Sequence, residues 1–163
     1  MNDAAILEVD QTAQGKEFLT FRIAQEEYGI DILKVREIRR YEPPTRIART
    51  PAFIKGVVNL RGTIVPIVDL RMKLHQNCVP QYSEFTVVII LNLLDRVVGI
   101  VVDSVSDVLQ LRPEHISDVP DFDSSIERDC LEGLGTVAGR MLILLDIEKL
   151  MSNVDMGLVP ADA

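Results

Sequence analysis

The side chains best suited to chemistry in this 163-residue chain are two histidines, two cysteines and several aspartates. His75 and His115 are the only histidines, and neither Cys78 nor Cys130 belongs to a Cys-x-x-Cys pair. Structural zinc sites usually gather four such ligands at short, regular spacings. The sequence therefore predicts no metal site and no bound cofactor.

Two aspartates have a simpler explanation than catalysis. Asp69 and Asp146 each follow an apolar stretch and precede a short amphipathic segment, LRMKL or IEKLM. An aspartate in that position is typical of a helix N-cap, where its carboxylate accepts a backbone N–H. The sequence also lacks a nucleophile with an adjacent proton acceptor and a phosphate-binding glycine loop. We expect no catalytic residues and no enzyme activity.

The overall charge argues against some classes of partner. The chain has 17 Lys and Arg against 25 Asp and Glu, a net charge of -8. Binding to nucleic acid or anionic lipid needs clustered positive charge, so we expect neither. No apolar run approaches the roughly 18 residues of a membrane span. These features predict a cytoplasmic protein that does not insert into a membrane.

An internal repeat organises the chain. Residues 18–38 align without a gap on residues 88–108, and residues 54–70 align on residues 131–147. The shared landmarks are Gly29 with Gly99, Gly56 with Gly133, Gly62 with Gly139, and Asp69 with Asp146. The order of the segments is the same in both halves, which indicates a duplicated structural unit.

Each repeat has the pattern of short β-strands. The segment FLTFRIA alternates sides, and VVNL and TIVPIV flank a predicted hairpin turn at Arg61 and Gly62. Pro66 cannot donate to a ladder, which predicts an edge strand or a bulge. About five strands in roughly 65 residues favour a small closed barrel, because closure removes exposed edges.

Four segments together resemble the CheW family of bacterial chemotaxis coupling proteins. They are EEYGIDILKVREI, TPAFIKGVVNLRGTIVPIVDLR, VVGIVVDSVSDV, and LEGLG followed by GRMLILLDIEKL. The resemblance implies an all-β fold of two intertwined, SH3-like five-stranded barrels with short helices. The expected units are an N-terminal tail at 1–15, a first barrel at 16–83, a second at 84–151 and a C-terminal tail at 152–163. The family pattern also allows the termini of the two barrels to be exchanged.

The same resemblance implies a function. Family members are non-catalytic adaptors that couple the histidine kinase CheA to transmembrane chemoreceptors. The implied partners are the C-terminal regulatory domain of CheA and the cytoplasmic tip of methyl-accepting chemoreceptors. The protein would be a monomer when isolated, and receptor arrays would recruit it to the inner face of the membrane.

The resemblance assigns receptor contact to five positions, Val35, Gly56, Arg61, Gly62 and Gly99. Most of them also have a structural explanation. Val35 aligns with another valine, and each of the three glycines aligns with a glycine, so folding alone could require them. Arg61 differs because its repeat equivalent is Ala138. We therefore expect Arg61 above all to contact a partner.

Kinase contact is expected at Ile38, Arg39, Arg40 and Tyr41, which precede the turn Glu42-Pro43-Pro44. Aromatic and arginine side chains often anchor interfaces. The alternative is a basic, solvated strand end.

Three other functions stay open on sequence alone. The chain could be a fragment of a kinase or of the related coupling–receiver fusion CheV, although it contains no kinase motif. It could be a small-barrel module that binds RNA or peptides, although it is acidic and lacks tryptophan. It could also be an enzyme with an unrecognised site.

Overall fold

The computed structural model describes residues 15–75, 79–94, 96–120 and 130–152. Apart from Gly15 and Ser152, the two predicted tails lie outside the described residues, and so does Cys78.

Most of the described chain forms β-strands, which confirms the predicted all-β class. The strands are β1 (Lys16–Ile23), β2 (Glu26–Asp31), β3 (Val35–Arg40), β4 (Ile54–Leu60), β5 (Thr63–Asp69), β6 (Val87–Asn92), β7 (Val97–Val102), β8 (Ser104–Leu111), β9 (Ile116–Ser117), β10 (Leu131–Val137) and β11 (Arg140–Leu145). The helical segments are η1 (Ile32–Lys34), α2 (Leu70–Leu74), η2 (Pro113–His115) and α3 (Ile147–Ser152). Each strand is short, as the spacing of turn signals predicts.

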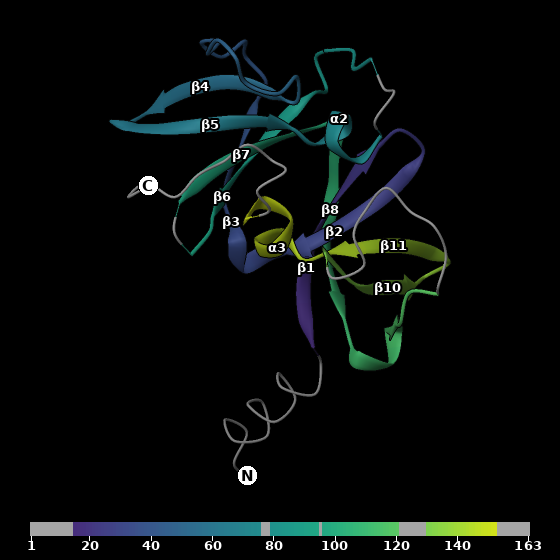
Figure 1. Ribbon diagram of the computed structural model, residues 1–163. Coiled ribbons are helices and arrows are strands. Elements are labelled where there is room, and N and C mark those ends of the chain that lie inside the picture. The colour runs from purple at the N-terminus through teal and green to yellow at the C-terminus, as the bar shows by residue number, and fades with distance from the viewer. Residues whose placement is uncertain (1–14, 76–78, 95, 121–129, 153–163) are drawn as a thin grey trace.

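The strands form two sheets that lie at different ends of the molecule (Figure 1). One has five strands in the order β3-β6-β7-β5-β4, and its strands follow one another along the chain. We call it the central barrel, because its strands come from the middle of the chain. The other has six strands in the order β8-β1-β2-β11-β10-β9, taken from both ends of the chain. We call it the outer barrel.

The barrels are intertwined because the two repeats exchange strands. In the outer barrel, Gly29 of β2 lies opposite Leu144 of β11. In the central barrel, Gly99 of β7 lies opposite Ile67 of β5, which is the equivalent pair in the repeat. Each barrel thus joins the first two strands of one repeat to later strands of the other. The predicted boundary between residues 83 and 84 lies between the two repeats. It does not lie between the two barrels, because each barrel contains strands from both sides of it.

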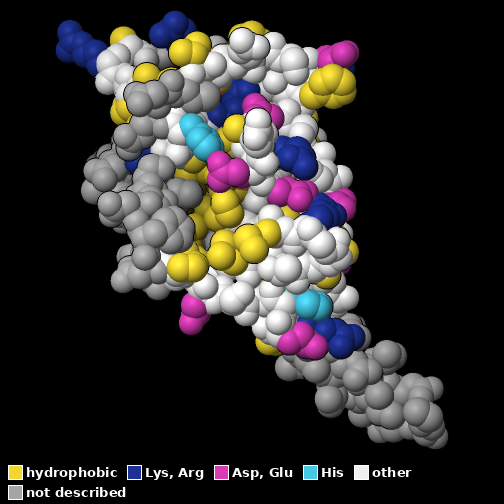
Figure 2. Space-filling model, turned by 90° about the vertical axis from the view of Figure 1, so that its right-hand side faces the viewer, with side chains coloured by type: hydrophobic (Ala, Val, Ile, Leu, Met, Phe, Trp, Pro, Cys, Tyr) yellow, Lys and Arg dark blue, Asp and Glu magenta, His cyan; other side chains and the backbone are white. Residues whose placement is uncertain are grey.

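The largest hydrophobic core belongs to both barrels at once. Phe21 and Ile30 from the outer barrel join Ile89 and Ile100 from the central barrel in one buried cluster. A smaller cluster around Val65 fills the central barrel, and another around Phe18 fills the outer one. On the face shown in Figure 2, hydrophobic side chains gather near the middle, with charged side chains around them. This shared core makes the folding of each barrel depend on the other.

The strand that contains Pro66 is not the edge strand that the sequence predicts. Strand β5 lies inside its sheet, between β7 and β4. Its pairing with β7 begins only at Ile67, one residue after the proline, so the missing N–H interrupts no bond of that ladder. The irregularity in this hairpin lies in β4, between Ile54 and Gly56.

Candidate functional site

All nine residues expected to contact a partner lie on the central barrel or directly after one of its strands. They are Val35, Ile38, Arg39 and Arg40 on β3, Tyr41 after it, Gly56 on β4, Arg61 and Gly62 in the β4–β5 turn, and Gly99 on β7. The structure therefore gathers a set that is spread over 65 positions of sequence into one five-stranded sheet. The candidate site is this barrel.

The turn between β4 and β5 presents an arginine to solvent. Arg61 and Gly62 have φ angles of 50° and 90°, and both lie in the left-handed region that tight hairpin turns of type I′ require. The side-chain oxygen of Asn59 accepts the Gly62 N–H at 2.8 Å and fixes the turn. The Arg61 side chain is 59% exposed, so much of the guanidinium is available to a partner.

Glu37 connects this turn to strand β3. Its carboxylate accepts hydrogen bonds from Arg61 Nη2 at 2.6 Å and from Arg39 Nη1 at 3.1 Å. The hydrogen bond from Arg61, followed by that from Arg39, lowers the pKa of Glu37 below its ordinary value. The expected receptor and kinase positions are thus two ends of one ion-paired cluster.

The remaining side chains on and after β3 differ in accessibility. Ile38, Arg39 and Arg40 are exposed. Val35 is half-buried and packs against the shared core, which matches its structural explanation. The ring of Tyr41 stacks on Tyr82 with 4.4 Å between centroids, so one side of it is already occupied.

Gly56 is buried and has a clear structural role. Its φ angle is 140°, and a Cβ there would lie 2.1 Å from the carbonyl oxygen of Thr45. The same arrangement recurs in the outer barrel, where a Cβ on Gly133 would lie 2.8 Å from the oxygen of Ser117. Close approach of a neighbouring backbone explains a glycine at both places.

Gly99 is also buried, in the middle of β7. A Cβ there would lie 2.7 Å from Ile67 Cδ1 and 2.8 Å from Val88 Cγ1. The barrel interior explains this glycine without any partner. Of the five positions expected to contact a receptor, Arg61 and Gly62 are the exposed ones.

Asp69 takes part in a buried ion pair in addition to the N-cap that the sequence predicts for it. Asp69 does cap α2 by accepting the Arg71 N–H, but both carboxylate oxygens also receive the Arg71 guanidinium, at 2.9 and 2.8 Å. That guanidinium further donates to Asp103 and to the Gln81 carbonyl oxygen. The Tyr82 hydroxyl donates to Asp69 at 2.8 Å. This network holds the 81–82 segment, and with it the ring under Tyr41, against the barrel.

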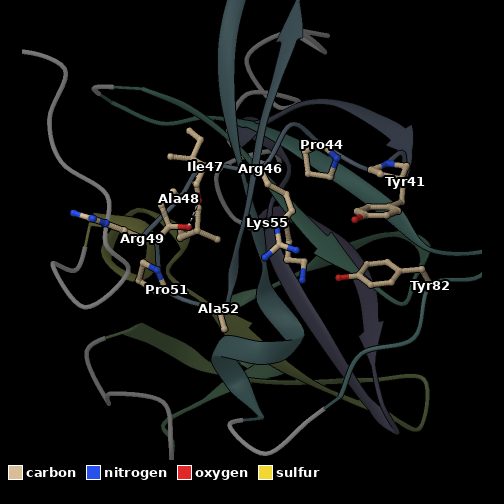
Figure 3. A pocket seen from close by; sticks show the side chains of 13 residues that line it. Tyr41, Pro44, Arg46, Ile47, Ala48, Arg49, Pro51, Ala52, Lys55 and Tyr82 are labelled. Atoms are coloured by element: carbon tan, nitrogen blue, oxygen red, sulfur yellow. Dashed lines mark hydrogen bonds between the residues drawn. The ribbon is translucent and has the colours of Figure 1, made fainter.

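A cleft beside these tyrosines contains basic residues that sequence reasoning missed. It has a volume of about 580 Å³ and is lined mainly by the connection from β3 to β4 (Figure 3). The lining includes Arg46, Arg49 and Lys55. The local charge composition could have indicated these basic residues. Residues 34–73 contain ten Lys and Arg but only three Asp and Glu, although the net charge of the whole chain is -8.

The groups considered for chemistry are dispersed. Within the described ranges, no three His, Cys, Asp or Glu side chains gather in a way that could hold a metal ion. His115 Nδ1 accepts the Arg112 N–H, and His75 lies 3.8 Å from Glu26. In the same part of the chain, no helix is long and apolar enough to cross a membrane. The arrangement presents contact surfaces rather than reacting groups.

Comparisons with known proteins agree with this geometry. Residues 17–155 match the family model described as the CheW-like domain. A chemotaxis protein CheW from Klebsiella aerogenes is 61% identical over 145 residues, covering 89% of this chain and 87% of the relative. One from Rhizobium meliloti is 36% identical over 142 residues, covering 87% and 91%. The crystal structure of the scaffolding protein TtCheW from Thermoanaerobacter tengcongensis superposes with a TM-score of 0.73 at 31% identity, covering 80% of this chain and 88% of that one.

Proposed function

Because this chain belongs to the CheW family, we propose that it couples the histidine kinase CheA to the cytoplasmic tips of methyl-accepting chemoreceptors. The chain is a non-catalytic scaffold protein of chemotaxis. The finer assignment adds its two partners, and with them its recruitment to receptor arrays at the inner face of the membrane. The isolated chain is a monomer in this proposal.

The observation that carries the proposal is the bridge made by Glu37. An adaptor must hold two partners in a fixed relation, and here a single carboxylate ties the Arg61 turn to Arg39 on β3. Receptor contact is assigned to the exposed Arg61–Gly62 turn. Kinase contact is assigned to the exposed side chains Ile38, Arg39 and Arg40, with Tyr41 at the end of the same strand.

The other three receptor candidates support the site indirectly. Val35, Gly56 and Gly99 are half-buried or buried, and their contacts are with the barrel itself. We propose that they shape the barrel that presents Arg61. Substitutions at these three positions would then lower receptor binding through the fold.

The test is reconstitution of kinase activity on receptor-containing membranes. Purified CheA is assayed with those membranes in the presence and absence of this protein, and attractant is then added. The proposal predicts strong kinase activation only when all three components are present, and loss of that activation on adding attractant. Equal kinase activity with and without this protein would contradict the proposal.

A further inference from the structure

The cleft beside Tyr41 and Tyr82 is held open by the backbone around it. Thr45 and Val57 exchange two backbone hydrogen bonds of 2.9 Å, which close the loop between β3 and β4 at its base. Within the loop, the Thr50 hydroxyl donates to the Ile47 carbonyl oxygen at 3.1 Å, and the Ile54 N–H donates to Pro51. A cleft fixed in this way loses little entropy when a ligand enters.

The cleft is positively charged, and none of the described residues that line it is acidic. The lining residues are Tyr41, Pro43, Pro44, Arg46, Ile47, Ala48, Arg49, Thr50, Pro51, Ala52, Ile54, Lys55 and Tyr82. Arg46 and Arg49 are exposed and, among the described residues, form no ion pair. The nearby carboxylate of Asp69 is neutralised by Arg71. The cleft therefore presents cations that lack counter-charges within the described structure.

The positive charges are spread along the cleft. In Figure 3, Arg46 and Lys55 lie between the tyrosine pair at one end and Arg49 at the other. The Lys55 ammonium lies 5.8 Å from the centre of the Tyr82 ring. Arg49 has a φ angle of 66°, a strained conformation for a side chain of its type that the closed loop maintains. This arrangement favours a ligand that carries several negative charges along its length.

We propose that this cleft binds an extended acidic peptide segment of a partner protein. Carboxylates of the segment would pair with Arg46 and Lys55 in the middle and with Arg49 at the end, while its backbone runs from Pro44 at one end of the cleft to Pro51 at the other. The volume is in the range of about 300–1,000 Å³ common to ligand sites. Because the chain outside residues 34–73 holds 22 acidic and seven basic residues, repulsion elsewhere would direct an acidic segment to this cleft.

This inference is independent of the coupling function, because the experiment contains neither kinase nor receptor. The probe is a fluorescein-labelled peptide of ten glutamates, titrated with the full chain at low salt and followed by fluorescence anisotropy. A labelled Gly-Ser peptide of the same length is the neutral control. We expect saturable binding of the glutamate peptide alone, weakening as salt screens the charges.

Substitutions then locate the site. Arg46→Glu and Lys55→Glu should each weaken binding by about tenfold or more, and Arg46→Ala by a smaller factor. The matched control is Arg22→Glu, an exposed arginine on the outer barrel whose reversal changes the net charge equally. It should leave the affinity within about twofold, and melting curves should show that all variants are folded.

Three results would overturn the inference. The wild-type chain could show no saturable binding at low salt. Arg22→Glu could weaken binding as much as Arg46→Glu, which would indicate attraction without a site. Inorganic phosphate could displace the peptide at a concentration equal to that of the peptide, which would indicate a site for a single small anion.

Discussion

The two barrels have equivalent strands and turns but differ in the side chains that they expose. Each places an acidic residue on the equivalent strand, Glu37 on β3 and Asp107 on β8, and each pairs it with an arginine from the facing hairpin. In the outer barrel, Arg140 is half-buried between Asp107 and Glu27, whose side chain is only 10% exposed. In the central barrel, Arg61 is 59% exposed.

This difference separates what the duplicated fold requires from what one barrel adds. Both barrels have the acid–arginine pair, the positive-φ turn and the glycine beneath a neighbouring backbone. The central barrel adds an exposed guanidinium and a basic cleft. In equivalent positions, the arginine of the outer barrel is half-buried between two carboxylates, whereas the arginine of the central barrel stays exposed.

The largest expected difference between the repeats concerns the two helix caps. Asp69→Ala should lower the free energy of unfolding by about 3–5 kcal/mol, because it leaves the buried Arg71 without its main partner. The equivalent Asp146→Ala removes a cap bond to Lys149 and should cost only about 1 kcal/mol. Urea denaturation of both variants measures the difference. Equal losses would show that the buried pair adds nothing beyond capping.

The second comparison concerns the two glycines at the barrel crossover. Gly99→Ala should destabilise the chain by about 1–3 kcal/mol, because the new methyl group meets the β-branched Val88 at 2.8 Å. Gly29→Ala meets the flexible end of Leu144 at 3.0 Å and should cost under about 1 kcal/mol. The entropic effect of replacing glycine is common to both variants and cancels. Chemical denaturation at matched protein concentration checks this, and a Gly99→Ala chain as stable as wild type would contradict the packing explanation of this glycine.

The third comparison concerns the paired arginines. Arg140→Ala should cost about 1–3 kcal/mol, since it leaves the nearly buried Glu27 carboxylate without its partner. Arg61→Ala should cost clearly less than Arg140→Ala, because its pair with Glu37 is largely solvated. Thermal melts at physiological salt measure both. A larger loss from Arg61→Ala would place the structural arginine in the central barrel and reverse our assignment.

The smallest expected effect is a loss of stability at low pH to which both barrels contribute. Hydrogen bonds from Arg140 and then Thr20 lower the pKa of Asp107, as those from Arg61 and Arg39 lower the pKa of Glu37. A carboxyl whose folded pKa is lowered stabilises the fold above its unfolded pKa, and that stability is lost as pH falls through the folded pKa. The free energy of unfolding should therefore decrease as the pH is lowered from about 4. Asp107→Asn and Glu37→Gln should each flatten this decline in denaturation curves from pH 5 to pH 2, and an unchanged decline would contradict the role of these pairs.

Periodicity and repeats predicted much of the architecture. The alternation in FLTFRIA, the Arg61–Gly62 turn and the ungapped match of Gly29 with Gly99 correspond to β1, the β4–β5 hairpin and equivalent strand pairings. Strand exchange was not readable from the residues alone, because either repeat could pair with itself using the same side chains. The resemblance to a known family supplied that feature.

The candidate site was harder to predict because contacts within the chain are invisible in a sequence. Arg61 stands out by its alanine equivalent, but the outer barrel provides the matching arginine two positions further on, as Arg140. Part of the asymmetry is therefore a shift of one structural role. The basic cleft depends on a loop folding back through the Thr45–Val57 bridge, and a local pattern does not predict such a bridge.

The central claim, that Arg61 on the central barrel serves recognition, is tested most directly by a charge swap. Wild type, Arg61→Glu and the double variant Glu37→Arg/Arg61→Glu are titrated against a receptor-tip fragment and against the CheA regulatory domain, with Arg140→Ala as the control from the outer barrel. We predict that Arg61→Glu loses about tenfold or more in receptor affinity, that the swap does not restore it, and that Arg140→Ala retains it. Full restoration by the swap would show that Arg61 acts only as the partner of Glu37 and would contradict the account.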